Sequence, residues 1–301
     1  MTSASENTRG AVLMAASMAA FVFNDSFMKA LLDDIPLNQA LFYRGVVSIV
    51  MVFIVVTRFV GPLRFRMSRR DWSLTTVRSI AEVGAAFTFL RAIASMPLAN
   101  ASAIMQTMPL SITIASVLIF RDPLGWRRML AIVIGFLGVL LIVKPGTDGF
   151  DSAALWALCA VVFVTIRDLS VRAMSHDAST STVTMSAVAL VTIVSGVALI
   201  GQPLAPMSAL NWAQLMGTGS FVVLGYVLSV IVMKVGDVSF VSPFRYTALV
   251  WALLVGFLVF GEWPDALALL GAATIAATGI YTVIREQRLA RRAAAAARDA
   301  S

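Results

Sequence analysis

Histidine and cysteine, the residues behind most metal and redox chemistry, are almost absent. The 301 residues include one cysteine, Cys159, and one histidine, His176. A single cysteine cannot form an internal disulfide, and a single histidine cannot build a histidine metal cluster. Nucleophile-elbow, His-x-x-x-His and P-loop patterns are also missing, so ATP is not an internal energy source. The sequence therefore predicts no enzyme activity, no metal and no cofactor.

Charge is also scarce. Charged residues make up only 13% of the chain, 59% is hydrophobic, and the mean hydropathy is +0.88. Soluble domains are about one quarter charged and half apolar. The composition excludes a soluble protein and predicts an all-α membrane protein, because each membrane-spanning helix takes about 20 apolar residues. The remaining residues are too few and too dispersed to form a separate soluble domain.

Apolar runs separated by glycine, proline and charged residues predict ten membrane spans. They lie near residues 10–32, 36–58, 72–95, 98–120, 125–143, 152–174, 180–201, 211–235, 238–260 and 265–284. The first run is longer than the apolar region of a signal peptide and carries Asn24, Asp25 and Lys29, so we interpret it as a retained span.

The basic residues between the spans predict the orientation. The chain has a net charge of +7, and nearly all of its loop arginines fall in alternate loops and the C-terminal tail. The opposite loops hold only Lys144 and are otherwise acidic. Because cytoplasmic loops hold the basic excess, both termini are predicted to be cytoplasmic. The basic excess is therefore an orientation signal and not a nucleic-acid site, and the arginine- and alanine-rich composition favours a bacterial inner membrane.

The second half of the sequence resembles the first. Residues 21–30 align with residues 164–173 at an offset of 143, which places Asp25 over Asp168 and Lys29 over Arg172. A second match, at an offset of 140, places Asp122 over Glu262. Five spans per copy is an odd number, so the second copy must enter the membrane from the other side. The sequence therefore predicts two inverted five-helix repeats, the plan of many secondary transporters.

The predicted domain organisation has four parts. They are a cytoplasmic N-tail at residues 1–9, the first repeat at 10–145, the second repeat at 146–285 and a basic cytoplasmic tail at 286–301. Two interpretations of the basic tail are open. It is either a helix lying on anionic lipid or a disordered segment that holds the C-terminus inside.

Several of these features occur together in one known family. They are the Asp25 and Lys29 pair that ends the first span, the sequence Phe42-Tyr43-Arg44 in the second, Pro109 in the fourth and Gly135-Phe136-Leu137-Gly138 in the fifth. Over roughly residues 10–285 the chain resembles the EamA type of the drug/metabolite transporter superfamily, and within it the YddG-type exporters of aromatic amino acids. The resemblance implies export of aromatic and other large apolar amino acids from the cytoplasm, by alternating access around a central cavity between the repeats.

One position departs from the family pattern. The acidic residue that follows the fourth span in the family appears here as Arg121-Asp122, whereas the second copy keeps Gly261-Glu262. We interpret this as an orientation and capping position, with no bearing on the substrate.

Charged residues inside the spans are candidates for gating. At 1.5 Å per residue, Asp25 and Arg44 lie at similar depth, and so do Asp168 and Arg245. We expect two ion pairs, one in each repeat. They either fix helix packing or take part in gating and coupling, because ionisable groups within a membrane are commonly functional.

Glu82 lies near the middle of the third span, one helical turn from Arg78. Desolvation would make it a proton-coupling group, whereas pairing with Arg78 or Arg44 would make it ionised scaffolding. We hypothesise uncoupled export by a monomer, with a dimer as the alternative state.

A cavity for an aromatic ligand needs apolar walls and a few polar groups. The candidates near mid-depth are Phe89, Gln106, Thr165, Tyr226, Phe244, Tyr246 and Trp251. Each could instead pack against a neighbouring helix or lipid. Pro109 and Pro243 are predicted to kink their spans, or to free backbone carbonyls for a ligand ammonium.

Other functions remain as alternatives. A proton-coupled exporter of drugs or cationic metabolites would use Glu82, and a sugar-phosphate carrier would use the basic residues inside the spans. An intramembrane aspartyl protease is disfavoured, because Asp25 and Asp168 lie at different depths, whereas a shared-proton pair needs carboxylates about 3 Å apart. A structural partner subunit would show no flux on its own. The expected partners are a small-molecule substrate and the lipid bilayer.

Overall fold

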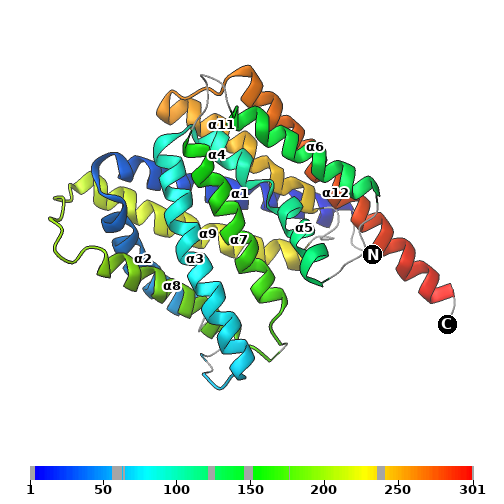
Figure 1. Cartoon of the computed structure of the whole chain (residues 1–301), viewed down its shortest axis with the longest axis horizontal. Coiled ribbons are helices and arrows are strands. Elements are labelled where there is room, and N and C mark those ends of the chain that lie inside the picture. Colours follow the sequence, from blue (N-terminus) through cyan, green and yellow to red (C-terminus); the bar gives the residue numbers. More distant parts are fainter. Residues whose placement is uncertain are drawn as a thin grey trace.

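The structure is a computed structural model that describes residues 4–55, 63, 65–120, 126–145, 152–175, 177–235 and 241–299. These residues form helices and short connections, with no strand among them (Figure 1). The helices in chain order are α1 (Ala4–Asp34), α2 (Leu37–Val55), α3 (Arg69–Ser95), α4 (Leu98–Met105), α5 (Met108–Phe120), α6 (Trp126–Val143), α7 (Ala153–Arg172), α8 (Thr180–Val197), α9 (Ala209–Val235), η2 (Ser242–Tyr246), α11 (Thr247–Phe260) and α12 (Ala266–Asp299).

The helix boundaries follow local sequence signals. Pro36 and Pro97 separate α1 from α2 and α3 from α4, where they limit the helical geometry of the residue before them. Ser68 caps α3 by accepting a hydrogen bond from the backbone N–H of Asp71. Gly261 ends α11 with a left-handed φ of 65°, which glycine adopts without strain.

The apolar helices suit a membrane. Among the described residues, seven helical segments are long and apolar enough to cross one. α3 is not among them and carries Arg78, Glu82 and Arg91. Both termini lie at the same end of the bundle, as an even number of spans requires (Figure 1). The count of ten spans and the cytoplasmic location of the termini stay predictions.

The observed helices differ from the predicted spans in two ways. The basic tail is helical, because α12 continues through the last span to Asp299. The tail is therefore helical, and its contact with anionic lipid stays a prediction. In addition, the predicted fourth and ninth spans are each divided in two, into α4 and α5 and into η2 and α11.

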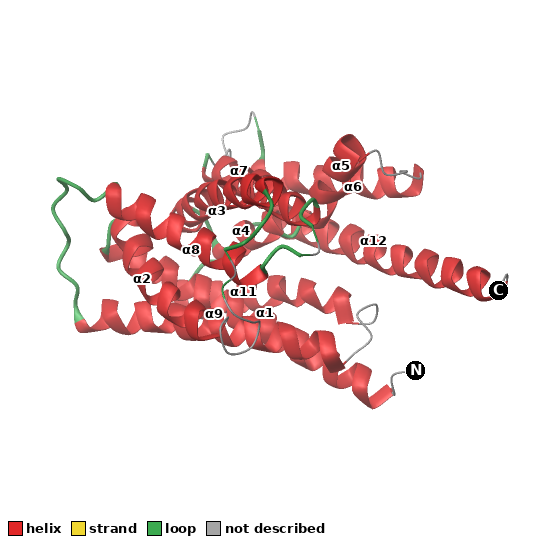
Figure 2. Ribbon diagram, turned by 90° about the horizontal axis from the view of Figure 1, so that it is seen from below, coloured by secondary structure: helices red, strands yellow, loops and turns green. Residues whose placement is uncertain are grey.

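Helix pairing repeats within the fold. α1 packs along α9 and α3 packs along α7, while α2 packs on α8 and α6 on α12 (Figures 1 and 2). The sequence alignment relates α1 to α7, and the order of spans in the two repeats relates α3 to α9, so the pair formed by α1 and α9 occurs a second time as α7 and α3. Between α6 and α12 the backbones almost touch, because a Cβ atom on Gly271 would lie 2.5 Å from the Gly138 carbonyl oxygen.

The two divided spans are built alike. The Thr107 hydroxyl donates to the Ile104 carbonyl at 2.6 Å, and the Thr247 hydroxyl donates to the Phe244 carbonyl, also at 2.6 Å. These two pairs are related by the offset of 140 found in the sequence. Pro109 follows the first break directly, where its missing N–H removes one helical hydrogen bond. Pro243 lies within the 3₁₀ segment η2.

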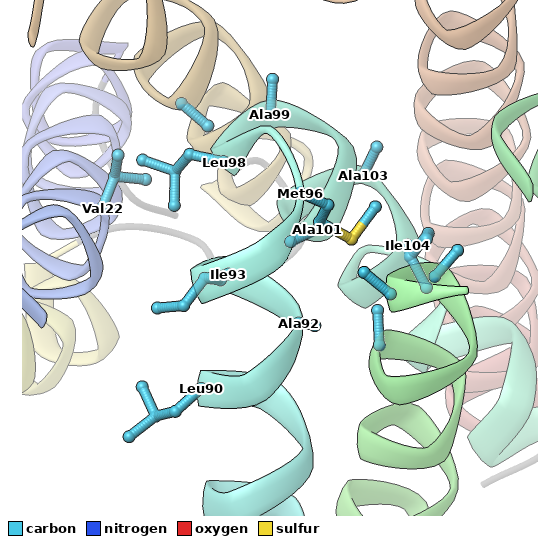
Figure 3. Packing of buried hydrophobic residues seen from close by; sticks show 14 of the residues in the cluster. Val22, Leu90, Ala92, Ile93, Met96, Leu98, Ala99, Ala101, Ala103 and Ile104 are labelled. Carbon is cyan, nitrogen blue, oxygen red and sulfur yellow. The ribbon is translucent and has the colours of Figure 1, made fainter. Parts of the chain in front are cut away.

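The buried core is centred on the connection between α3 and α4. Leu90, Ile93 and Leu98 are almost fully buried there, and Val22 of α1 faces them (Figure 3). The short α4 is apolar and small-residue rich, so it packs tightly between α7, α11 and α12.

Candidate functional site

Opposite charges from α3 and α7 meet in the middle of the bundle. Glu82 Oε2 lies 3.9 Å from Arg78 Nη2 and 3.5 Å from Arg167 Nη1. The Arg167 Nε atom donates a hydrogen bond to Asp168 Oδ1 at 2.8 Å. The side chains are 15–34% exposed, so this charge network is partly open. Glu82 is therefore shared by two arginines.

The predicted pairing of Asp168 with Arg245 is wrong. Asp168 binds the arginine beside it, Arg167. Arg245 lies in η2, where its side chain is exposed and its backbone carbonyl accepts a hydrogen bond from Gln106 Nε2 at 3.0 Å. Equal depth did not bring the two residues together, because the rotation of each helix decides which way a side chain points. Arg167 was recognised in the sequence only as a basic residue inside a span.

Asp25 and Arg44 form a looser arrangement on α1 and α2. Asn24 Nδ2 donates to Asp25 Oδ1 at 2.8 Å, and Arg44 is the charged side chain that acts on Asp25. Within the described residues no ion pair shorter than 4 Å forms between them. The predicted partnership is therefore electrostatic and leaves room between the charges.

Tyr226 on α9 reveals the space that these charges surround. The residue is 60% exposed, and its ring meets that of Phe21 edge-on at 5.3 Å. Its hydroxyl nevertheless lies in the electrostatic field of Glu82, Arg44 and arginines of α3 and α7. Tyr226 therefore marks an open space beside these charges, which come from α2, α3 and α7. An aromatic wall continues along α1 and α9, where Phe23 and Phe27 contact the ring of Phe221.

Several buried polar atoms near this space have no hydrogen-bond partner. Within the described residues these include Asn24 Oδ1, Glu82 Oε2 and Arg78 Nε. Buried polar groups are usually satisfied by protein or water. Two acceptors and one donor near this space are therefore left without a hydrogen bond among the described residues.

The other predicted cavity residues have mostly structural contacts. Thr165 is buried and donates to the Val161 carbonyl of its own helix. Trp251 Nε1 donates to the Ala15 carbonyl on α1. Gln106 joins the two helix breaks through Arg245.

The three remaining aromatic candidates are partly or fully covered. Phe89 packs against the main core, and Phe244 against a smaller cluster around Met14. Tyr246 is buried against Gly279. Of the predicted cavity residues, Tyr226 is the one with a recorded electrostatic interaction with the central charges, and the cavity role of all these residues stays a prediction.

A separate groove of about 490 Å³ lies between η2, α11 and α12. It is lined by Phe244, Leu249 and Ile280 among other side chains, none of them charged. A zwitterionic or charged solute has no partner there. The groove is therefore a less suitable transport site than the charged centre.

Comparison with known proteins agrees with this architecture. The chain matches the EamA-like transporter family over residues 8–144 and again over residues 151–285. A riboflavin transporter of Vibrio cholerae is 29% identical over 252 residues, which cover 82% of this chain and 84% of that protein. A pseudopaline exporter of Pseudomonas aeruginosa is 24% identical, with coverage of 87% and 92%.

One further relative and one solved structure are also similar to this chain. An S-adenosylmethionine uptake transporter of Rickettsia felis is 25% identical over 64% of this chain and 65% of that protein. One crystal structure has the same fold, with a TM-score of 0.64 at 17% identity and coverage of 94% of this chain and 99% of that one. The chain therefore belongs to the EamA-like transporter family of the drug/metabolite superfamily, and is a multi-pass inner-membrane transporter of small molecules.

Proposed function

We propose that the protein exports amino acids with an aromatic or other large apolar side chain from the cytoplasm, by alternating access around the charged centre. One observation carries the proposal: the exposed side chain of Tyr226 lies within electrostatic reach of the Glu82 carboxylate and of three arginines, Arg44, Arg78 and Arg167. A zwitterionic amino acid needs an anion for its ammonium group and a cation for its carboxylate. An aromatic substrate side chain also gains from edge-on or stacked contact with a ring.

Within the site, Asp25 and Arg44 are the best partners for the substrate. Their charges are close enough to interact but form no ion pair shorter than 4 Å. Asp25 would hold the ammonium group and Arg44 the carboxylate, while Phe21 and Tyr226 would contact the aromatic ring. Glu82 is less suited to bind an ammonium group, because two arginines already share it.

The same contacts support uncoupled transport. A proton-coupled drug exporter would require Glu82 to leave both arginines before it could take up a proton or a cation. Its partners within 4 Å favour the interpretation as ionised scaffolding. The driving force in this proposal is the substrate gradient alone.

The proposal includes ten spans, cytoplasmic termini and two inverted repeats at residues 10–145 and 146–285, acting as a monomer. The two family matches fall close to these bounds. The repeated pairing of α1 with α9 and of α3 with α7 also supports the division. One repeat would rock against the other around the centre.

Riboflavin is a second candidate substrate. The Vibrio cholerae relative is named a riboflavin transporter, and the wall formed by Phe23, Phe27, Phe221 and Tyr226 suits a planar ring. The names of the relatives include both an uptake transporter and an exporter. The proposed direction therefore rests on the resemblance to exporters of aromatic amino acids.

Proteoliposomes containing only this protein test the proposal. They are loaded with labelled tryptophan, phenylalanine, riboflavin or a quaternary ammonium compound, and efflux is followed with and without a pH gradient. We expect efflux of the two amino acids at the same rate in both conditions. Efflux of riboflavin alone would replace the amino-acid proposal, and gradient-dependent efflux of the ammonium compound would establish the coupled alternative.

Two matched variants locate the site. Asp25→Asn should reduce amino-acid efflux, whereas Asp33→Asn, the same change on an exposed residue near the end of the same helix, should not. Equal efflux from both variants would contradict a binding role for Asp25.

A further inference from the structure

A second charged cluster lies away from the centre, at the end of the bundle opposite the termini. Lys29 Nζ of α1 lies 2.6 Å from Glu262 Oε1, in the connection between α11 and α12. The Lys29 ammonium also donates to the Met96 carbonyl at 2.7 Å and lies over the ring of Phe260. Lys29 is only 6% exposed, so every contact is made inside the protein.

The other oxygen of Glu262 binds the start of α4. Its Oε2 atom accepts the backbone N–H of Leu98 at 3.1 Å. The first N–H groups of a helix have no partner within the helix, so a carboxylate there is stabilising. Gly261 positions Glu262 by turning the chain in the left-handed conformation, and the Glu262 N–H then donates to the Gly256 carbonyl. The expected capping role of this position thus has a defined partner in another helix.

The cluster joins the two halves of the chain where α4 meets α11, a contact called the α4–α11 seam below. Lys29 and the connection between α3 and α4 belong to the first family match, whereas Phe260 and Glu262 belong to the second. The ion pair therefore holds α4 against α11, above the tightly packed core around Met96 and Leu98 (Figure 3).

At the opposite end of the bundle, the described helices pack differently. The repeat relates α4 to η2 and α11 to α5, so an equivalent contact would join η2 to α5. In the described residues α5 packs on α7 and η2 packs on α1 and α12, without close packing of η2 on α5. Among the described residues, the contacts between α4 and α11 therefore close the bundle at the Lys29–Glu262 end.

We propose that the Lys29–Glu262 ion pair keeps this end of the bundle closed to solute, and we call this ion pair the latch. Its docking on Met96 and Leu98 holds α4 against α11, and solute passes that end only after α4 undocks. At the other end, α7 and α5, the counterparts of α1 and α11, are also packed together, and Arg172, the counterpart of Lys29, donates to Ser116 of α5 at 2.7 Å. This inference rests on transport by alternating access.

A cysteine reporter tests the latch without any substrate. In a Cys159→Ser background, Ala99→Cys places a thiol on α4, where residue 99 is 6% exposed beside Leu249 and Leu253 of α11. Ala81→Cys, on α3 where it is 2% exposed, reports general loosening. Each reporter is combined with Glu262→Gln, which keeps an acceptor for Leu98 but removes the charge. Asp265→Asn is the control, because it disrupts the nearby pair with Lys144 outside the α4–α11 seam.

The reagent is a membrane-impermeant maleimide, applied to the purified full-length protein in oriented proteoliposomes. Glu262→Gln should raise the labelling rate at residue 99 at least about fivefold, as expected when a minor open state becomes a major one. Labelling at residue 81 and labelling with Asp265→Asn should stay at the parent level. No rise at residue 99, or an equal rise at both reporters, would overturn the latch. A failed flux assay would contradict the proposed substrate and leave this result standing.

Discussion

The two charged clusters of the molecule differ in how completely their atoms are paired. At the closed end, Lys29 and Glu262 approach to 2.6 Å, and both also bind backbone groups of the α3–α4 connection. In the centre, Glu82 lies 3.5 Å or more from its two arginines, and its Oε2 atom lacks a hydrogen bond. Lys29 is buried, whereas Glu262, at 24% exposed, resembles the central side chains at 15–34%.

This difference distinguishes the Lys29–Glu262 latch, which holds helices together, from a site that binds a ligand. A tightly paired ion pair has little hydrogen-bonding capacity left for a ligand, but its contacts can change when helices move. Loosely paired charges around an open space retain that capacity. The following predictions test whether the two clusters behave so differently.

The largest effect is expected from Arg167→Met in the centre. The change leaves Glu82 and Asp168 without their shared cation, and breaking a partly buried ion pair in this way costs about 3 kcal/mol or more. Folded protein should be largely lost, as measured by the monodisperse fraction on size-exclusion chromatography. Arg91→Met, on an exposed arginine of the same α3–α7 pair, is the control and should change the yield little. A fully stable Arg167→Met protein would show that the central network is not scaffolding.

Asp25→Asn should act on function and not on folding. Among the described residues Asp25 has no ion-pair partner within 4 Å, so its loss should change the free energy of unfolding by about 1 kcal/mol or less. Tryptophan efflux should fall at least about tenfold, which corresponds to about 1.4 kcal/mol. Efflux rates and thermal unfolding measured on the same preparation separate the two effects. Loss of stability in proportion to loss of efflux would assign Asp25 to the scaffold.

The helix breaks between α4 and α5 and between η2 and α11 are built alike. Thr107→Val and Thr247→Val test whether the two breaks are equivalent. Each change removes one hydroxyl hydrogen bond of the same kind and length, worth about 1 kcal/mol. We expect similar losses in the two variants, measured as shifts in the unfolding midpoint in detergent. A loss confined to one variant would show that the two breaks are not equivalent.

The smallest effect on stability is expected from a change at Asp71, at the end of the bundle that carries the termini. Asp71 accepts hydrogen bonds from the Ser175 backbone N–H, the Ser68 hydroxyl and the Ser175 hydroxyl, and these hold the pKa of its carboxyl below the usual range. The Ser175 N–H has the largest influence. Because the folded pKa is lowered, the contribution to stability is complete above the unfolded pKa of about 3.9 and is lost as the pH falls through the folded value.

Asp71→Asn should therefore lower the unfolding midpoint by a few degrees, and equally so at neutral and mildly acidic pH. The difference from the parent protein should shrink only in strong acid, below the unfolded pKa. Unfolding midpoints measured across pH in detergent check this. A difference that disappears between neutral and mildly acidic pH would require a different group.

The sequence predicted the helices well because apolar runs and the prolines between them are local signals. It did not predict the partner of Asp168, since depth along a helix can be counted but rotation cannot. The neighbouring Arg167 and Asp168 were visible as adjacent opposite charges, which was the available signal for the observed pair. Glu262 was recognised as a capping position through the repeat, but its contact with Lys29 depends on tertiary packing.

Tryptophan binding tests the central claim most directly, because it compares the two clusters in one assay. Titration calorimetry would measure the Kd for the wild type, Asp25→Asn and Glu262→Gln in detergent. A binding site in the centre and a latch at the end predict that Asp25→Asn raises the Kd at least about tenfold. Glu262→Gln should change it little, because a shift between two states that bind the ligand equally leaves affinity unchanged. An unchanged Kd in Asp25→Asn, or an equal loss in both variants, would contradict the account.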